Sequence, residues 1–170
     1  GRNTPEAYVE RAQLKRRKFK DFNSALKDYN LSIEYNPNSA KFHVFRGLLY
    51  ARNFRNFIAA EKDYRRSVEI DPECGTCWVS LGYLSERLSN DEMIFALEMA
   101  LKFGIDLNFD GNFISNFFIY GQIAEIKVEE EDYKSAIDLF QKLIDNYEEF
   151  DSDGDGKVDE TGYLDYAYSS

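Results

Sequence analysis

Acidic residues near the end of the chain have a spacing that suits a hard metal ion. Asp151, Asp153 and Asp155 alternate with small or polar residues, and Gly156 follows directly. Alternating side chains can turn towards one ion, glycine allows a sharp turn, and carboxylate oxygens are the ligands that Ca²⁺ prefers. We therefore expect a calcium site at Asp151, Asp153 and Asp155.

This segment resembles the first part of the EF-hand calcium loop, D-x-[DN]-x-[DN]-G. The resemblance implies two further ligands, the carbonyl oxygen of Lys157 and Asp159, and Val158 stands where that loop has an apolar anchor. The twelfth position, which should carry a bidentate glutamate, is Gly162, and Glu160 comes two places early. The resemblance implies an EF-hand-like loop with weak affinity for Ca²⁺, and a solvated acidic turn is the alternative.

Two cysteines are a second group that could do chemistry. Cys74 and Cys77 have the spacing of redox dithiols and of zinc half-sites. A redox motif of this kind is typical of a βαβ unit, and a zinc site would need a second ligand pair, whereas His43 is the single histidine. We expect two cysteines in a loop, either free or bridged. With no nucleophile–histidine set and no phosphate-binding glycine loop, we predict that the protein is not an enzyme.

The elements that position these groups repeat at an interval of 35 residues. Nine residues recur at this spacing: Arg11, Phe19, Phe22, Ala25, Asp28, Tyr29, Ser32, Glu34 and Pro37 return as Arg46, Phe54, Phe57, Ala60, Asp63, Tyr64, Ser67, Glu69 and Pro72. A period near 34 indicates stacked helix–turn–helix units that cannot bury their apolar faces alone.

Apolar residues within each repeat follow a helical spacing. Ala25, Tyr29, Ser32 and Ile33 lie three or four residues apart, on one stripe of a helix. Thr4-Pro5 is a helix start, and Asn36-Pro37 and Asp71-Pro72 are helix stops. These signals predict helices from residue 5 to about 18, and at about 22–35, 39–52, 57–70, 91–103, 113–129 and 133–149, with one extra residue between the helices of the first two pairs.

The repeats resemble the tetratricopeptide repeat (TPR), whose unit reads W-x2-L-G-x2-Y, A-x3-F and P. Trp78-x-x-Leu81-Gly82 matches the opening, Ala25 with Tyr29 and Ala60 with Tyr64 match the second helix, and Pro37 and Pro72 match the end. The resemblance covers about residues 5–149. It implies an all-α superhelical array of about four antiparallel helix pairs.

On this basis the chain divides into four parts. Three TPR units occupy residues 5–103 (5–37, 38–72 and 73–103), and 104–112 form an irregular connection. A fourth TPR-like pair occupies 113–149, where Tyr133, Ala136, Phe140 and Leu143 carry the apolar stripe, and 150–170 hold the acidic loop and tail.

The resemblance also implies a partner-binding groove lined by the first helix of each pair. The corresponding positions are Val9, Gln13, Arg16, Arg17, Val44, Leu48, Arg52, Val79, Tyr83, Glu86, Arg87, Phe118, Gln122 and Glu125. The places where some TPR domains grip a C-terminal carboxylate hold Val9, Gln13, Val44 and Leu48, so that mode is disfavoured. An amphipathic helix or extended apolar segment fits better. A fourth pair or tail that fills the groove is the alternative. Arg17, Arg52 and Arg87 are expected at first-helix ends, where a cation complements the helix dipole.

Charge is distributed unevenly along the chain. Residues 1–70 hold 15 Lys or Arg against 8 Asp or Glu, whereas the whole chain has a net charge of −10. This asymmetry would allow head-to-tail self-association, and the acidic bulk disfavours nucleic-acid binding. No apolar run approaches the about 20 residues of a membrane span.

We therefore predict a non-enzymatic adaptor or scaffold for a protein or peptide partner. The alternative is a calcium-dependent module in which the ion orders the tail and changes access to the groove. The acidic loop and the cysteine pair favour an extracytoplasmic setting such as a bacterial envelope or periplasm.

Overall fold

The structure is a computed structural model that describes residues 4–84, 87–105 and 116–145. Every regular element in these ranges is a helix, which confirms the all-α class. The chain forms two compact units, Gly1–Phe103 and Gly104–Ser170, and each is described by itself. The first contains α1 (Pro5–Leu14), η1 (Lys15–Phe19), α2 (Phe22–Tyr35), α3 (Ala40–Asn53), α4 (Phe57–Ile70), α5 (Gly75–Gly82) and α6 (Asn90–Phe103). The second contains α7 (Asn116–Glu129) and α8 (Tyr133–Asp145).

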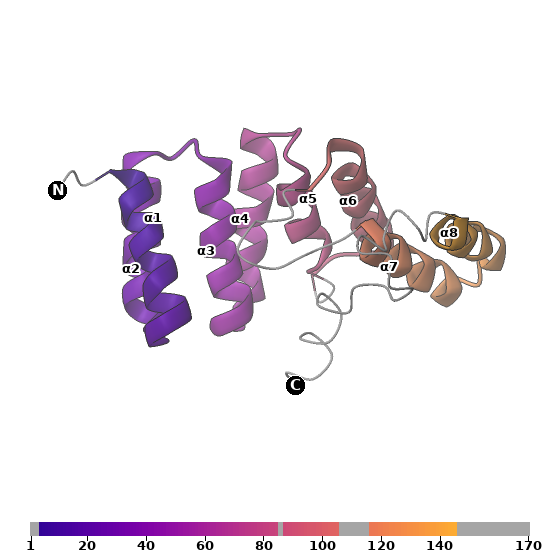
Figure 1. The fold of residues 1–170 in the computed structure, drawn as a ribbon, viewed down its shortest axis with the longest axis horizontal. Helices are drawn as coiled ribbons and strands as arrows, with labels where there is room; N and C mark the ends of the chain where they lie inside the picture. Colours follow the sequence, from indigo (N-terminus) through magenta and orange to yellow (C-terminus); the bar gives the residue numbers. More distant parts are fainter. Residues whose placement is uncertain (1–3, 85–86, 106–115, 146–170) are drawn as a thin grey trace. The chain divides into compact units, whose positions relative to one another are not determined.

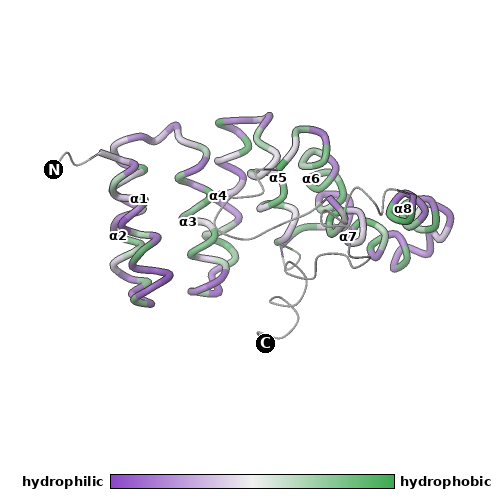
Figure 2. Tube along the Cα trace, viewed as in Figure 1, coloured by the Kyte–Doolittle hydropathy of each residue, from purple (hydrophilic) through white to green (hydrophobic). Residues whose placement is uncertain are grey.

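Helices of the first unit are paired in chain order. α1 packs on α2, α3 on α4 and α5 on α6, while α2 also contacts α3 and α4 contacts α5 (Figure 1). The three pairs therefore form one continuous row. Hydrophobic and hydrophilic residues alternate around most of these helices (Figure 2), as expected for helices that bury one stripe and leave another in water. In the second unit, α7 packs on α8.

Side chains cap the helices at the places that the sequence indicates. Thr4 Oγ1 accepts a hydrogen bond from the Ala7 amide at 3.2 Å. Ser89 and Glu92 form the expected capping box: the Ser89 amide donates to Glu92 Oε2, and the Glu92 amide donates to Ser89 Oγ. Asp132 Oδ1 accepts from the Ser135 amide at 3.3 Å. α2 and α4 stop immediately before Asn36 and Asp71, so the ranges 22–35 and 57–70 are confirmed.

The extra residue of the 35-residue period lies in a wide turn at the end of each first helix, rather than in a longer loop. After α1, the chain continues directly as the π-helical turn η1 to Phe19, so the predicted helix from residue 5 to about 18 is confirmed in extent, with a π-helical last turn. At the end of α3, the Phe54 amide bonds to the Leu49 carbonyl, five residues back. Lys20 and Arg55 then adopt left-handed backbone angles, with φ of 54° and 51°, and reverse the chain. A π-type turn accommodates one more residue than an α-turn, which explains the period.

Small and large residues alternate where paired helices approach most closely. Ala12 and Gly47 on the first helices are buried, as are Tyr29 and Tyr64 on the second helices. A Cβ atom placed on Gly47 would lie 2.5 Å from Cε1 of Tyr64. Between pairs, the rings of Tyr29 and Phe45 stack with their centroids 6.2 Å apart. Close backbone approach within a pair is therefore a requirement of the fold, as the alternation of residue size predicts.

We predict opposite effects for two glycine-to-alanine substitutions. Gly47→Ala should lower the free energy of unfolding by about 1–3 kcal/mol, because the new methyl group collides with the buried Tyr64 ring. Gly121→Ala in α7 should raise it by up to about 1 kcal/mol, because no described residue lies within 4 Å of the added Cβ and alanine favours a helix. Urea denaturation followed by circular dichroism measures both. A Gly47→Ala protein as stable as the wild type would contradict the close approach.

Candidate partner-binding surface

Two repeated ion pairs fix the first helix of a pair against the second. Arg11 donates to both carboxylate oxygens of Asp28, at 2.8 and 2.7 Å, and Lys15 Nζ lies 2.8 Å from Asp28 Oδ2. Arg46 makes the same two-bond contact with Asp63, again at 2.8 and 2.7 Å. Both aspartates are buried. Such forked contacts fix both distance and rotation, so they orient the helices that carry the candidate surface.

His43 and Asn30 extend the second of these contacts. His43 Nδ1 lies 3.1 Å from Asp63 Oδ1, and its Nε2 lies 3.1 Å from the Pro37 carbonyl oxygen. Arg46 also donates to Asn30 of the preceding pair at 2.9 Å. The network therefore joins α2, α3, α4 and the turn between the first two pairs.

Opposing effects act on the pKa of Asp63. Burial raises it, but hydrogen bonds and charge from Arg46 and His43 outweigh burial and hold the pKa below its ordinary value. The pKa of Asp28 is lowered in the same way, by Arg11 and Lys15 against burial. Because both folded-state values are depressed, these carboxylates contribute stability above the ordinary aspartate pKa of about 3.9. That contribution is lost as the pH falls through the lowered values.

The third pair replaces this ion pair with apolar residues. Leu81 occupies the position of Arg46, one repeat later. Leu97 packs over Gly82 as Tyr64 packs over Gly47, which places Ala96 at the position of Asp63. Both Leu81 and Ala96 are buried. The same helix–helix contact is therefore built with charges in two pairs and without them in the third.

We predict that the apolar solution of the third pair can be transferred to the second. Asp63→Ala alone should lower the free energy of unfolding by about 3–5 kcal/mol, because it leaves Arg46 without its buried partner. Adding Arg46→Leu should restore about 1–3 kcal/mol of that loss. Urea denaturation of the two variants checks this. Losses that simply add in the double variant would show that the two side chains do not act as a pair.

The predicted groove residues of the first unit fall into three sets of equivalent positions that differ in solvent exposure. Val9, Val44 and Val79 occupy equivalent places on α1, α3 and α5 and are buried, with no exposed surface at the last two. Gln13, Leu48 and Tyr83, one turn further on, range from buried at Leu48 to half-buried at the other two. Arg16 and Arg52 are half-buried and Arg17 is exposed. The valines thus offer little or no surface to a partner, and the groove itself stays a prediction.

Arg87 is not at a helix end, so the expected ladder of three arginines has only two members. α5 ends at Gly82, and Arg87 follows it outside any helix. Its Nε donates to Glu61 Oε2 of α4 at 2.8 Å, while Arg65 holds the other Glu61 oxygen at 2.9 Å and also reaches Glu92. Hydrogen bonds from Arg65 and Arg87 lower the pKa of Glu61. Arg87 therefore connects the second and third pairs and does not cap a dipole.

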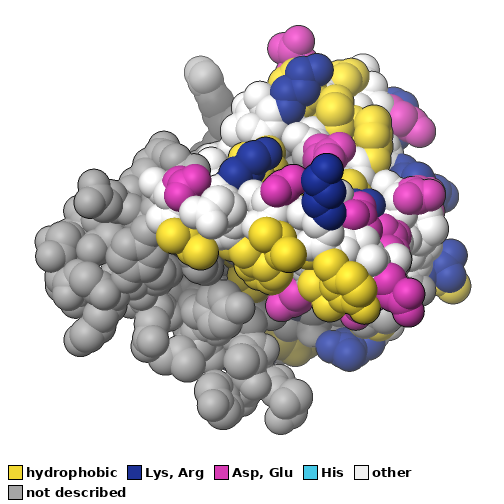
Figure 3. Space-filling view, turned by 90° about the vertical axis from the view of Figure 1, so that its right-hand side faces the viewer, with side chains coloured by type: hydrophobic (Ala, Val, Ile, Leu, Met, Phe, Trp, Pro, Cys, Tyr) yellow, Lys and Arg dark blue, Asp and Glu magenta, His cyan; other side chains and the backbone are white. Residues whose placement is uncertain are grey.

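The second unit holds the remaining groove positions and an apolar face that the sequence analysis missed. On α7, Phe118 and Gln122 are half-buried, and Gln122 donates to Glu125 at 3.0 Å. On α8, Ala136 and Leu143 are buried, but a second stripe is exposed: Tyr133, Ile137, Phe140 and Ile144. Figure 3 looks at the side of Figure 1 where α8 lies, and hydrophobic side chains gather there beside charged ones. The predicted stripe of Tyr133, Ala136, Phe140 and Leu143 thus combines residues of both stripes, although the spacing along 133–144 distinguishes them.

The expected calcium ligands and one groove residue cannot be placed. Asp151, Asp153, Asp155, Lys157, Asp159 and Glu86 lie outside the described residues. Within the described ranges, no three His, Cys, Asp or Glu side chains are grouped in a way that could hold a metal ion. None of the helices in those ranges is long and apolar enough to cross a membrane.

The two cysteines, for which the sequence allows either free thiols or a bridge, are bridged. Cys74 and Cys77 form a disulfide at the start of α5.

Paired helices with a repeated small-against-large contact define a helical-repeat protein. Residues 40–74 match the family model described as tetratricopeptide repeat. MamA (41-end) from Desulfovibrio magneticus RS-1 superposes with a TM-score of 0.68 and 16% identity, covering 89% of this chain and 80% of that one. The first TPR of Spaghetti (RPAP3), bound to the HSP90 peptide SRMEEVD, superposes with a TM-score of 0.62 and 18% identity, covering 75% of this chain and 94% of that one. BtubC (BKLC) from P. vanneervenii superposes with a TM-score of 0.68 and 16% identity, covering 87% of this chain and 65% of that one.

A search of curated proteins finds no match. The chain thus has the TPR fold and contains a recognisable repeat at residues 40–74. At these identities, the similarity to solved structures concerns the fold alone. Proteins of this fold generally act in protein–protein interaction and are typically not enzymes.

Proposed function

We propose that the chain is a non-enzymatic adaptor that binds a peptide or helix along α1, α3 and α5. The observation that carries this proposal is the repeated arrangement on these three helices. Gln13, Leu48 and Tyr83 each follow a buried valine by one turn, and Arg17 in η1 and Arg52 in α3 follow one turn later in the first two pairs. Equivalent side chains at equal steps suit a linear partner that runs across successive pairs.

The chemistry of these positions specifies the kind of segment. Tyr83, which is half-buried, offers aromatic surface beside the buried Leu48. Aromatic and arginine side chains are those that most often dominate binding energy. Arg16, Arg17 and Arg52 supply positive charge beside it, and residues 1–70 carry a net positive charge. The partner we propose is an apolar segment flanked by acidic residues.

The TPR of Spaghetti (RPAP3) supports peptide binding as a mode open to this fold, because it is bound to an HSP90 peptide. The present chain has Val9, Gln13, Val44 and Leu48 where a carboxylate-gripping TPR has lysine and asparagine. Recognition should therefore depend on internal apolar and acidic residues of the partner and not on its terminal carboxylate.

A displayed library of random peptides, selected on the purified chain, tests this proposal. We expect enriched sequences to combine apolar with acidic residues. In calorimetric titration, Arg52→Glu should weaken the selected peptide about tenfold or more, because an attractive charge becomes repulsive. Amidation of the peptide C-terminus should leave the affinity unchanged.

Arg66→Glu is the matched control. Arg66 is an exposed arginine of α4 that pairs with Glu69 of its own helix. Thermal melts establish that each variant is folded. Equal weakening by both substitutions, or none by Arg52→Glu, would count against the surface on α1, α3 and α5, and strict dependence on a free carboxylate would count against the proposed partner chemistry.

A calcium-dependent form of this function is a second proposal, and it rests on the sequence of the acidic loop. The spacing of Asp151, Asp153 and Asp155 before Gly156 supports it. Calorimetric titration of Ca²⁺ should show saturable binding that Asp151→Ala with Asp155→Ala abolishes. Peptide affinity should differ between Ca²⁺ and chelator. A flat titration would remove the ion site, and unchanged peptide binding would remove the coupling.

A further inference from the structure

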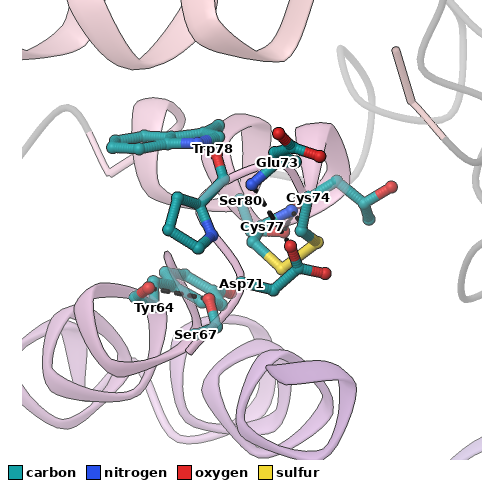
Figure 4. Close-up of a disulfide and its surroundings, with 10 residues drawn as sticks. Tyr64, Ser67, Asp71, Glu73, Cys74, Cys77, Trp78 and Ser80 are labelled. Carbon is teal, nitrogen blue, oxygen red and sulfur yellow. Dashed lines mark hydrogen bonds between the residues drawn. A yellow bond between two sulfur atoms is a disulfide. The ribbon is translucent and has the colours of Figure 1, made fainter. Parts of the chain in front are cut away.

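The disulfide lies where the chain enters α5. Cys74 is the residue immediately before the helix, Cys77 is in its first turn, and their Cα atoms are 5.2 Å apart (Figure 4). The surrounding backbone is held by other contacts. The Cys74 amide donates to the Asp71 carbonyl at 3.2 Å, and the Trp78 indole donates to the Pro72 carbonyl at 2.8 Å. The two sulfur atoms are therefore brought together by a turn that is fixed independently of the bond between them.

This disulfide adds little to the constraint on the chain. Its half-cystines are three residues apart in sequence. The stabilisation from a cross-link grows with the length of the loop it closes, and a loop this short is near the minimum. A mainly structural role therefore does not explain the bridge.

The two sulfur atoms have different surroundings. Cys77 is completely buried, whereas Cys74 is half-buried. The amide of Cys77 lies 3.1 Å from Cys74 Sγ, so it donates a hydrogen bond to that sulfur. The start of a helix favours negative charge. Cys74 is thus the accessible sulfur, and its thiolate would be stabilised by the Cys77 amide and by α5.

We propose that Cys74 and Cys77 form a redox-active dithiol–disulfide pair, with Cys74 as the exchanging sulfur and Cys77 as the buried resolving one. This inference does not depend on the proposed peptide-binding function. It revises the expectation from sequence, which assigns no redox role to this spacing outside a βαβ unit. The structure supplies the features that the spacing alone lacks: a helix start, an amide donor and unequal burial.

The exchange partner is a dithiol, and the step balances without another reagent. One thiolate of the dithiol attacks Cys74 Sγ, the bond between Cys74 and Cys77 breaks, and Cys77 leaves as a thiolate that takes up a proton. The second thiolate of the partner then attacks the partner's other sulfur in the mixed disulfide and expels Cys74 as a thiolate, which takes up the second proton. The partner loses two electrons and two protons, and the cysteine pair gains both.

Acidic side chains beside the pair favour a particular class of partner. Asp71 and Glu73 are exposed and lie next to the disulfide (Figure 4). Their charges repel an anionic thiol such as glutathione. A neutral or cationic dithiol, including a cysteine pair in a protein segment without acidic neighbours, is the expected reactant.

Single-cysteine variants of the full chain test the assignment. With Cys77→Ser and with Cys74→Ser, the rate of mixed-disulfide formation with cystamine, a cationic disulfide, is followed by mass spectrometry. Cys74 in the first variant should react about tenfold or more faster than Cys77 in the second, because only Cys74 is accessible and has an amide donor. In guanidinium chloride the two rates should converge. Equal rates in the folded proteins, or faster reaction of Cys77, would overturn the proposal.

The wild-type chain supplies the second measurement. It is equilibrated with mixtures of reduced and oxidised dithiothreitol, and its free thiols are trapped and counted. We expect reversible reduction at a defined ratio, with the helical circular dichroism signal retained. Resistance to reduction until the chain unfolds, or loss of helix on reduction, would show a structural bridge and overturn the redox role, even if peptide binding is established.

Discussion

The closest approach of the two helices within a pair is the contact on which the rest of this structure depends. Gly47 has no side chain, so α3 can lie against the Tyr64 ring of α4, and Gly82 allows the same approach to Leu97 in the third pair. This spacing lets Arg46 donate two hydrogen bonds to the buried Asp63. It also sets the rotation of α1, α3 and α5, and hence which of their side chains lie beneath the surface and which remain accessible.

The contrast between the pairs shows which features are required and which are interchangeable. The small-against-large contact occurs in both the second and the third pair, whereas the forked ion pair is replaced by Leu81 and Ala96 in the third. Burial of apolar surface is the common stabilising term, because a buried ion pair repays its desolvation only when both partners and their hydrogen bonds are in place. The charged version joins neighbouring pairs through Asn30, which the apolar version cannot do.

Much of this fold could be predicted from residue spacing. The period of 35, the stops before Pro37 and Pro72, and the caps at Thr4, Ser89 and Asp132 each act within a few residues, so sequence alone reveals them. Other features depend on tertiary contacts. The wide turn at Lys15–Phe19, the early end of α5 and the contact of Arg87 with Glu61 could not be derived from spacing. The roles of the cysteines likewise depend on unequal burial, which an isolated motif does not show.

A surface on the first helices of the pairs is the central claim of this account. Hydrogen–deuterium exchange of the chain, with and without a selected peptide, tests it most directly. We predict that added protection is concentrated in α1, α3 and α5, because the half-buried Gln13, Arg52 and Tyr83 lie on these helices or at their ends. Protection confined to α2, α4 and α6, or to the helices of the second unit, would contradict it.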